Sequence, residues 1–244
     1  MSPDGNKIAV ASNRGGYYDN YEFYVMNANG TNLSRRTNND AYGGGPTWQP
    51  VTDPRGCTFI GTQAANTIRG SSGDDVICGY GGVDKLYGLG GHDKIYGDGS
   101  ADTLYGRGGA DILVGGPADD TLYGQGGNDR IFGQRGNDIL IGARGADRVN
   151  GGGDQDVLRG GPQSDLLVGS GGRDRMVGGT GNDVLKGGAG ADRLRDTQGR
   201  DRLYGGTWRD FLHVRDNSRG DLANGGGGSD TCRTDRRDTR RSCP

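Results

Sequence analysis

Aspartate recurs at nine-residue intervals through the middle of this chain, and this is the pattern best suited to chemistry. In rows of nine that run from Gly61 to His213, the sixth position is Asp in sixteen of seventeen rows, and Asn66 is the exception. Of the 31 acidic residues only Glu22 is Glu. Short carboxylates held at tight turns would repel one another unless a cation lay between them. Carboxylate and carbonyl oxygens in a flexible shell suit Ca²⁺ better than Mg²⁺.

The rest of each row indicates how these carboxylates are positioned. The first position is Gly in sixteen rows, with Asp196 as the exception, and the eighth is aliphatic or Met in all seventeen, from Ile68 to Leu212. Glycine permits positive φ and close approach of neighbouring coils. The last residues of a row are typical of a short strand with the eighth side chain pointing inward.

Two rows close one coil of eighteen residues as turn, strand, turn, strand. The pattern therefore predicts an all-β fold, a right-handed parallel β-roll of about eight and a half coils over residues 61–213. A further row is expected from Gly225 after a two-residue shift, with Cys232 in the apolar position.

The row Gly178-Gly179-Thr180-Gly181-Asn182-Asp183-Val184-Leu185-Lys186 and the following row, Gly187 to Arg195, resemble the RTX (repeats-in-toxin), haemolysin-type calcium-binding repeats. The resemblance covers roughly 150 residues and is very specific, because many rows share one phase. It implies that several Ca²⁺ ions bind, each between rows i and i+2. In that family the carbonyls of positions two and four and the Asp of position six surround the ion.

Carried onto this sequence, the resemblance implies a set of aspartate and glycine metal ligands. The implied carboxylate ligands are Asp75, Asp84, Asp93, Asp102, Asp111, Asp120, Asp129, Asp138, Asp147, Asp156, Asp165, Asp174, Asp183 and Asp192. The implied carbonyl ligands are those of Gly82, Gly91, Gly109, Gly127, Gly136, Gly145, Gly172, Gly179, Gly181, Gly188 and Gly190. The best sites are expected between Ser72 and Asp147 and from Gly171 to Asp192.

Some rows depart from the pattern and leave an alternative open. Position four lacks glycine in several rows, for example at Ala64, Ala118, Gln163 and Trp208. Arginine directly precedes the aspartate at Arg173, Arg200 and Arg209, and arginines bring the net charge to only −2. The alternative is a metal-free solenoid in which Asp–Arg pairs satisfy the turns.

The four cysteines form two local pairs near the ends of the repeats. Cys57 with Cys78, and Cys232 with Cys243, are predicted disulfides, which indicates an oxidising compartment and a secreted, extracellular protein. Idle thiols or a zinc site are the alternatives, although no close Cys-x-x-Cys spacing occurs. The given sequence starts without the features of a signal peptide, and we expect it to be the C-terminal part of a longer protein.

Residues 1–50 do not share the nonapeptide. Strands are predicted at Lys7–Ser12 and Tyr21–Met26, with Asn29-Gly30 as a tight turn. The segment, up to Pro46-Thr47-Trp48, resembles one TolB-like β-propeller blade; a hairpin cap over the open end of the roll is the alternative. Residues 51–60 read as a linker, and residues 214–244 as a degenerate repeat with a disulfide-clamped cap.

The predicted function is calcium binding that drives the folding of a secreted, non-catalytic structural or accessory module. The only histidines are His92 and His213, so neither a His-Glu-x-x-His zinc site nor an ordinary catalytic triad is expected, and no Gly-x-Ser-x-Gly occurs. The alternative is a module that binds a protein or cell-surface partner and uses Ca²⁺ only to keep its shape. Neither nucleic acid binding nor a membrane span is predicted from the net charge and the short apolar runs.

Overall fold

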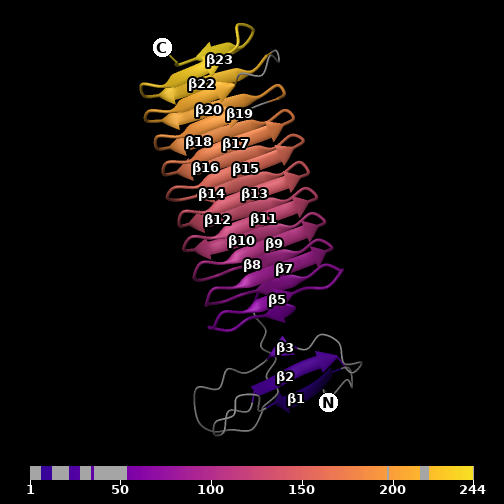
Figure 1. The fold of residues 1–244 in the computed structure, drawn as a ribbon. Coiled ribbons are helices and arrows are strands. Elements are labelled where there is room, and N and C mark those ends of the chain that lie inside the picture. Colours follow the sequence, from indigo (N-terminus) through magenta and orange to yellow (C-terminus); the bar gives the residue numbers. More distant parts are fainter. Residues whose placement is uncertain are drawn as a thin grey trace.

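The computed structural model describes residues 7–12, 22–27, 34–35, 54–196, 198–214 and 220–243, and all of its regular elements are β-strands (Figure 1). The described part of the chain contains no helix that could cross a membrane. An antiparallel three-stranded sheet precedes two long parallel sheets that face each other along the roll.

The strands of the two parallel sheets alternate along the chain. One sheet holds β4 (Phe59–Ile60), β6 (Val76–Cys78), β8 (Lys94–Tyr96), β10 (Ile112–Pro117), β12 (Arg130–Arg135), β14 (Arg148–Gly152), β16 (Leu166–Gly171), β18 (Val184–Ala189), β20 (Arg202–Thr207), β22 (Leu222–Gly227) and β24 (Thr239–Arg241). The other holds β5 (Thr67–Arg69), β7 (Lys85–Gly90), β9 (Thr103–Gly108), β11 (Thr121–Gly126), β13 (Ile139–Arg144), β15 (Val157–Pro162), β17 (Arg175–Thr180), β19 (Arg193–Asp196), β21 (Phe211–Val214) and β23 (Thr231–Thr234).

The register between neighbouring strands confirms the predicted coil. Leu104 pairs with Leu86 on one side and with Leu122 on the other, a step of eighteen residues each time. Two successive rows therefore supply one strand to each sheet. The parallel β-roll inferred from the nine-residue period is the observed fold.

A single column of side chains fills the space between the two sheets. The eighth-position residues from Ile77 to Leu212 are all fully buried, and the column continues through Ala223 to Cys232. Because strand side chains alternate in direction, positions six and one of the next row also point inward. The core therefore places the aspartates beside the aliphatic column.

The turns depend on left-handed backbone at positions two and four. In the row from Gly106, Arg107 has φ 80° and Gly109 has φ 121°. At position four the backbone keeps this conformation in three of the four departures named above: φ is 87° at Ala118, 77° at Gln163 and 81° at Trp208, whereas Ala64 is not left-handed. These three departures thus strain the turn without changing its backbone conformation.

Replacement of one turn glycine is expected to destabilise the roll strongly. A Cβ at Gly109 would overlap the carbonyl group of Gly91 in the coil below, and the backbone is left-handed there. We expect Gly109→Ala to lower the free energy of unfolding by about 2 kcal/mol or more. Urea unfolding at saturating Ca²⁺ would measure it.

Ala118 provides the matched control for this change. It occupies the same position of its row with φ 87°. Ala118→Gly is expected to be neutral or to stabilise by up to about 1 kcal/mol, because relief of strain outweighs the greater freedom of the unfolded chain. Equal losses in both variants would contradict the assignment of strain to position four.

The repeats continue beyond His213. The expected row from Gly225 is confirmed, with Asp230 and Cys232 buried in their positions. A row that the sequence reasoning missed precedes it: Asp221 is buried at position six and Ala223 at position eight. Arg202 pairs with Leu222, a step of twenty, so a two-residue insertion shifted the phase and concealed this row.

The N-terminal sheet comprises β1 (Lys7–Ser12), β2 (Glu22–Asn27) and β3 (Ser34–Arg35), all antiparallel. The first strand matches its prediction and the second is shifted by one residue. All other residues of the segment 1–50, including Asn29-Gly30, lie outside the described residues. The propeller-blade interpretation therefore stays a prediction.

An outward aromatic ladder runs along one sheet. The rings of Tyr87, Tyr105 and Tyr123 stack with centroids 4.8 and 5.0 Å apart, and Tyr123 pairs with Ile141. The guanidinium group of Arg107 lies 5.5 Å from the Tyr87 ring centroid. Such cross-strand contacts favour a fixed register between neighbouring strands.

Candidate metal centre

The sixth-position aspartates form a buried ladder that follows the axis of the roll. Each carboxylate follows a turn and precedes a strand, where the alternation of side chains points it inward. From Asp84 to Asp210 these aspartates are between 0% and 3% exposed. Buried carboxylates occur only where hydrogen bonds, cations or protons offset the loss of water.

One oxygen of each carboxylate is satisfied by backbone. The Oδ1 atom of Asp129 accepts a hydrogen bond of 2.9 Å from the N–H of Asp111, two rows earlier, and Asp147 does the same for Asp129 at 2.8 Å. The series runs from the N–H of Asn66, bound by Asp84, to the N–H of Asp210, bound by Asp230.

The second oxygen, Oδ2, is buried and accepts no hydrogen bond in a long series of rows. This holds for Asp84, Asp93, Asp102, Asp111, Asp120, Asp129, Asp138, Asp147, Asp156, Asp165, Asp174, Asp183, Asp192, Asp210 and Asp230. A single native fold rarely leaves so many buried polar atoms bare. The regularity of the series indicates that the turns are built for an ion.

Asp75 differs from the other predicted aspartate ligands. Its Oδ2 already accepts hydrogen bonds from the backbone N–H and the hydroxyl of Ser71, at 2.6 and 2.9 Å. In the first turn that carries a ladder aspartate, Ser71 thus supplies the hydrogen bonds to Oδ2. Its carboxylate has less capacity left for a cation.

A second oxygen converges on the same space as the bare carboxylate oxygen. A Cβ built on Gly97 would lie 2.6 Å from Asp102 Oδ2 and 2.7 Å from the carbonyl oxygen of Gly115, which begins the row after next. Any residue larger than glycine would fill this cradle. The first-position carbonyl was missed as a candidate ligand, although glycine in sixteen of seventeen first positions was its signal.

The carbonyls predicted as ligands line the gap between coils. All eleven glycines assigned to this role have left-handed backbone. The second-position carbonyl of Asp98 faces Gly116, and the fourth-position carbonyl of Gly91 faces Gly109. The atoms nearest to the first-position cradle are instead the carboxylate and the first-position carbonyl.

Without metal, burial raises the pKa values of the ladder carboxyl groups. Burial raises the pKa of Asp84 to about 6, that of Asp120 to about 7 and that of Asp165 to about 8. The hydrogen bond from backbone opposes this rise, and neighbouring aspartate charges add to it. Near neutral pH the ladder therefore needs protons or cations.

Arginines do not supply that positive charge in two of the three rows where they were suspected. Arg173 and Arg209 directly precede Asp174 and Asp210, yet Oδ2 of each aspartate accepts no hydrogen bond. The metal-free arrangement with Asp–Arg pairs is thus not formed at these turns. Oxygen atoms that accept no hydrogen bond and lie in a closed turn are suitable ligands for Ca²⁺, which is a hard cation.

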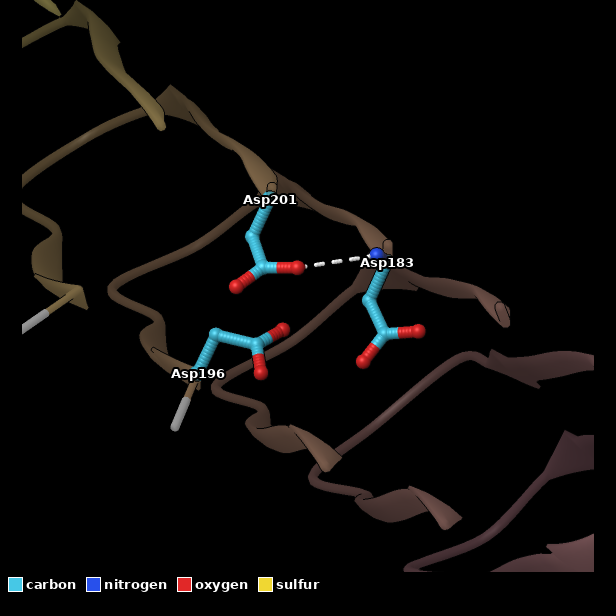
Figure 2. Close-up of side chains that lie close together, drawn as sticks. All are labelled: Asp183, Asp196 and Asp201. Carbon is cyan, nitrogen blue, oxygen red and sulfur yellow. Dashed lines mark hydrogen bonds between the residues drawn. The ribbon is translucent and has the colours of Figure 1, made fainter. Parts of the chain in front are cut away.

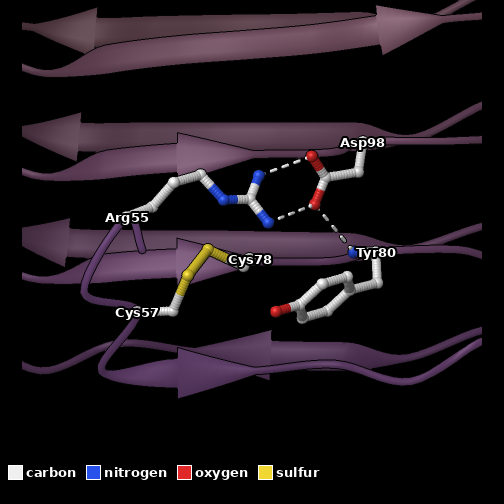
Figure 3. Close-up of polar contacts among 5 residues, drawn as sticks. All are labelled: Arg55, Cys57, Cys78, Tyr80 and Asp98. Atoms are coloured by element: carbon white, nitrogen blue, oxygen red, sulfur yellow. Dashed lines mark hydrogen bonds and ion pairs between the residues drawn. A yellow bond between two sulfur atoms is a disulfide. The ribbon is translucent and has the colours of Figure 1, made fainter. Parts of the chain in front are cut away.

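Two disulfides close the ends of the described roll. Cys57 is bonded to Cys78 and Cys232 to Cys243, as predicted, which excludes the zinc alternative for these residues. Near the first bond, Arg55 makes hydrogen bonds of 2.6 and 3.0 Å to both carboxylate oxygens of Asp98 (Figure 3). The same guanidinium lies 5.4 Å from the Tyr80 ring centroid.

His92 has a structural contact on an exposed turn. Its Nδ1 accepts a hydrogen bond of 2.8 Å from the N–H of Ala110, and its own N–H donates to Asp74. Side chains at position five thus bind the turn two rows away. This contact gives His92 a structural role in the turn.

Comparison with known proteins agrees with this geometry. The family model for the RTX calcium-binding nonapeptide repeat (4 copies) matches residues 60–95, 79–113, 105–140, 114–149, 132–167, 150–185, 168–195 and 186–213. The curated proteins contain no match to this sequence. Because the family model covers more than half of the chain, the protein belongs to the family of RTX calcium-binding nonapeptide repeat proteins.

Proposed function

We propose that this chain is a secreted, non-catalytic structural module whose roll folds when Ca²⁺ binds between rows i and i+2. The observation that supports this most directly is the series of buried Oδ2 atoms that accept no hydrogen bond. Burial of so many bare carboxylate oxygens is costly unless a cation binds them. Bound Ca²⁺ supplies the positive charge that this ladder needs.

The proposed ligands are the aspartates and glycines inferred from the sequence, with one addition. Oδ2 of the sixth-position aspartate and the carbonyl of the first-position glycine two rows on act together, as at Asp102 and Gly115. Oδ1 fixes the carboxylate by its backbone hydrogen bond. Among the fourteen aspartates, Asp75 is proposed to contribute least, because Ser71 holds its Oδ2.

The concentration of Ca²⁺ outside cells suits such sites. At a Kd of about 0.1 mM, about 1 mM Ca²⁺ adds about 1.4 kcal/mol per site, whereas submicromolar Ca²⁺ adds almost nothing. Summed over about ten sites, this approaches the stability of a whole domain. The two disulfides are compatible with an oxidising location. Together these features support a chain that orders only after export.

A Ca²⁺ titration of the oxidised, chelator-stripped protein at pH 7.5 tests this function. Far-ultraviolet circular dichroism is expected to show a cooperative gain of β-structure, with little response to the same concentration of Mg²⁺. Mg²⁺ is the control for ionic strength and for non-specific divalent binding. A spectrum that is already that of the folded roll in chelator, and that Ca²⁺ does not change, would count against the proposal.

A further inference from the structure

One row carries a carboxylate where the others carry glycine. Asp196 occupies the first position of its row, at the end of β19, and strand alternation turns it inward. It is only 2% exposed. Figure 2 shows its side chain beside those of Asp183 and Asp201, the sixth-position aspartates of rows i and i+2. Three buried carboxylates therefore lie side by side between two neighbouring coils, a position along the axis that is called a level of the roll below.

The three side chains are held at this level by backbone contacts. Asp201 Oδ1 accepts a hydrogen bond of 2.9 Å from the N–H of Asp183, and Asp196 Oδ1 accepts one of 3.2 Å from the N–H of Gly179. One oxygen of each carboxylate lies within 4.8 Å of one oxygen of the other two. This spacing allows a single cation to contact all three groups.

Space for an ion lies next to Gly178. A Cβ on this glycine would lie 2.6 Å from Asp183 Oδ2 and against Asp196 Oδ2. Asp183 is fully buried, and its Oδ2 accepts no hydrogen bond. A bare oxygen thus points into a cradle that only glycine leaves open.

Charge gives this level its distinct chemistry. Three ionised carboxylates in a buried space repel one another more strongly than the two present at other levels of the ladder. The nearby Arg195 and Arg200 side chains are exposed. A multivalent cation is the ligand that removes this repulsion, and each of the three carboxylates offers one oxygen to it.

We propose that Asp183, Asp196 and Asp201 form a carboxylate-rich Ca²⁺ site that binds more tightly than the repeating turn sites. The inference rests on the proposed function, since two of its ligands belong to the ladder. It goes beyond that function in assigning a ligand to the position that glycine holds in other rows. Affinity for Ca²⁺ rises with the number of charged ligands, so binding at least about ten-fold tighter than at the other turns is expected.

Equilibrium dialysis over a range of buffered free Ca²⁺ tests this site. The full oxidised chain is stripped with chelator, and bound Ca²⁺ per chain is measured by mass spectrometry of the metal. The wild type is expected to bind one ion at free Ca²⁺ about ten-fold below the midpoint of the remaining ions. Asp196→Asn, which keeps an oxygen for the Gly179 N–H but removes the charge, is expected to abolish this first step and leave the later binding.

Two further variants control for folding and for the type of change. Asp196→Gly restores the residue of the other rows, so the turn is retained, and the tight step is again expected to disappear. Asp154→Gly makes the same replacement at an exposed position four, where Asp154 Oδ2 accepts a hydrogen bond from the Gly136 N–H, and it should leave the tight step unchanged. Circular dichroism in saturating Ca²⁺ checks that each variant is folded.

The outcomes separate this inference from the proposed function. Ca²⁺ binding by the wild type as one class of equal sites, or a tight step that survives Asp196→Asn, overturns the inference and leaves the function intact. An absence of Ca²⁺ binding at every concentration overturns both. Loss of the tight step in Asp154→Gly as well would show that its loss in the Asp196 variants is not specific to these three carboxylates, and would overturn the inference.

Discussion

Stripped of Ca²⁺, the roll is expected to be folded near pH 4.5 and to lose its β-structure as the pH rises through about 6 to 8. Ten ladder carboxyls have pKa values between about 6 and about 8 in the folded chain, against an ordinary value of 3.8. Burial is the main cause, and neighbouring carboxylates add to it.

The direction of the effect follows from proton uptake. Between these pKa values the folded chain binds more protons than the unfolded chain, so the free energy of unfolding falls as pH rises. The stabilisation is complete below about pH 3.8, the value for the unfolded chain, and is lost as pH passes through the folded values. A protonated carboxyl can also donate a hydrogen bond; the Gly115 carbonyl lies beside the same cradle as Asp102 Oδ2.

Thermal unfolding followed by circular dichroism would measure this dependence in chelator at pH 4.5, 6, 7 and 8. A control series with 2 mM Ca²⁺ is expected to stay folded at pH 8, because the ion replaces the protons there. Calcium affinity should accordingly rise with pH over the same interval. An unfolding temperature in chelator that is as high at pH 8 as at pH 4.5 would refute the link between burial of the ladder and its need for charge.

Removal of one carboxylate from the middle of the ladder is expected to have the second large effect. Asp129→Ala leaves the buried N–H of Asp111 without its acceptor, which costs about 1–3 kcal/mol. It also removes a proposed Ca²⁺ ligand, worth about 1.4 kcal/mol at extracellular Ca²⁺. The combined loss in the free energy of unfolding is about 2–4 kcal/mol at pH 7.5.

Asp129→Asn separates the two contributions. The amide oxygen still accepts from Asp111, so only the loss tied to Ca²⁺ is expected, and it should vanish in chelator at pH 4.5. Asp119→Ala is the control: this exposed aspartate accepts from the Asn137 N–H, and its loss should cost less than about 1 kcal/mol. Urea unfolding with and without Ca²⁺ compares all three. If Asn and Ala proved equally destabilising under every condition, the hydrogen bond would not be a separate contribution.

The fold could be predicted from the sequence because each position of the row has one physical task. Only an inward side chain is aliphatic in every row, and only a crowded turn needs glycine so often. The period then determines the coil, as the pairing of Leu104 with Leu86 and Leu122 shows. Repetition made a weak local signal decisive.

Parts of the site could not be predicted in the same way. The two-residue insertion before Asp221 broke the phase, and the pattern alone does not show that the parallel pairing continues there with a step of twenty residues. The role of the first-position carbonyl depends on where the carboxylate points, which is a matter of packing between coils. Asp196 could be read only as a departure from the pattern, because the row alone does not show that its side chain reaches Asp183, which lies two rows earlier.

The backbone hydrogen bonds of the ladder also give the rod a polarity. The aspartate carboxylates of each coil accept hydrogen bonds from the aspartate N–H groups of the preceding coil. The N–H groups of Asp201 and Asp210 therefore donate to Asp221 and Asp230 near the C-terminal end. If coils are removed from that end, the aspartate N–H groups of the new terminal coil lose their carboxylate acceptors. If coils are removed from the other end, none of these N–H groups loses its acceptor. The Cys232–Cys243 disulfide therefore stabilises the end that supplies the carboxylate acceptors for the preceding coils. Ordering of the coils is favoured from this end toward the N-terminus.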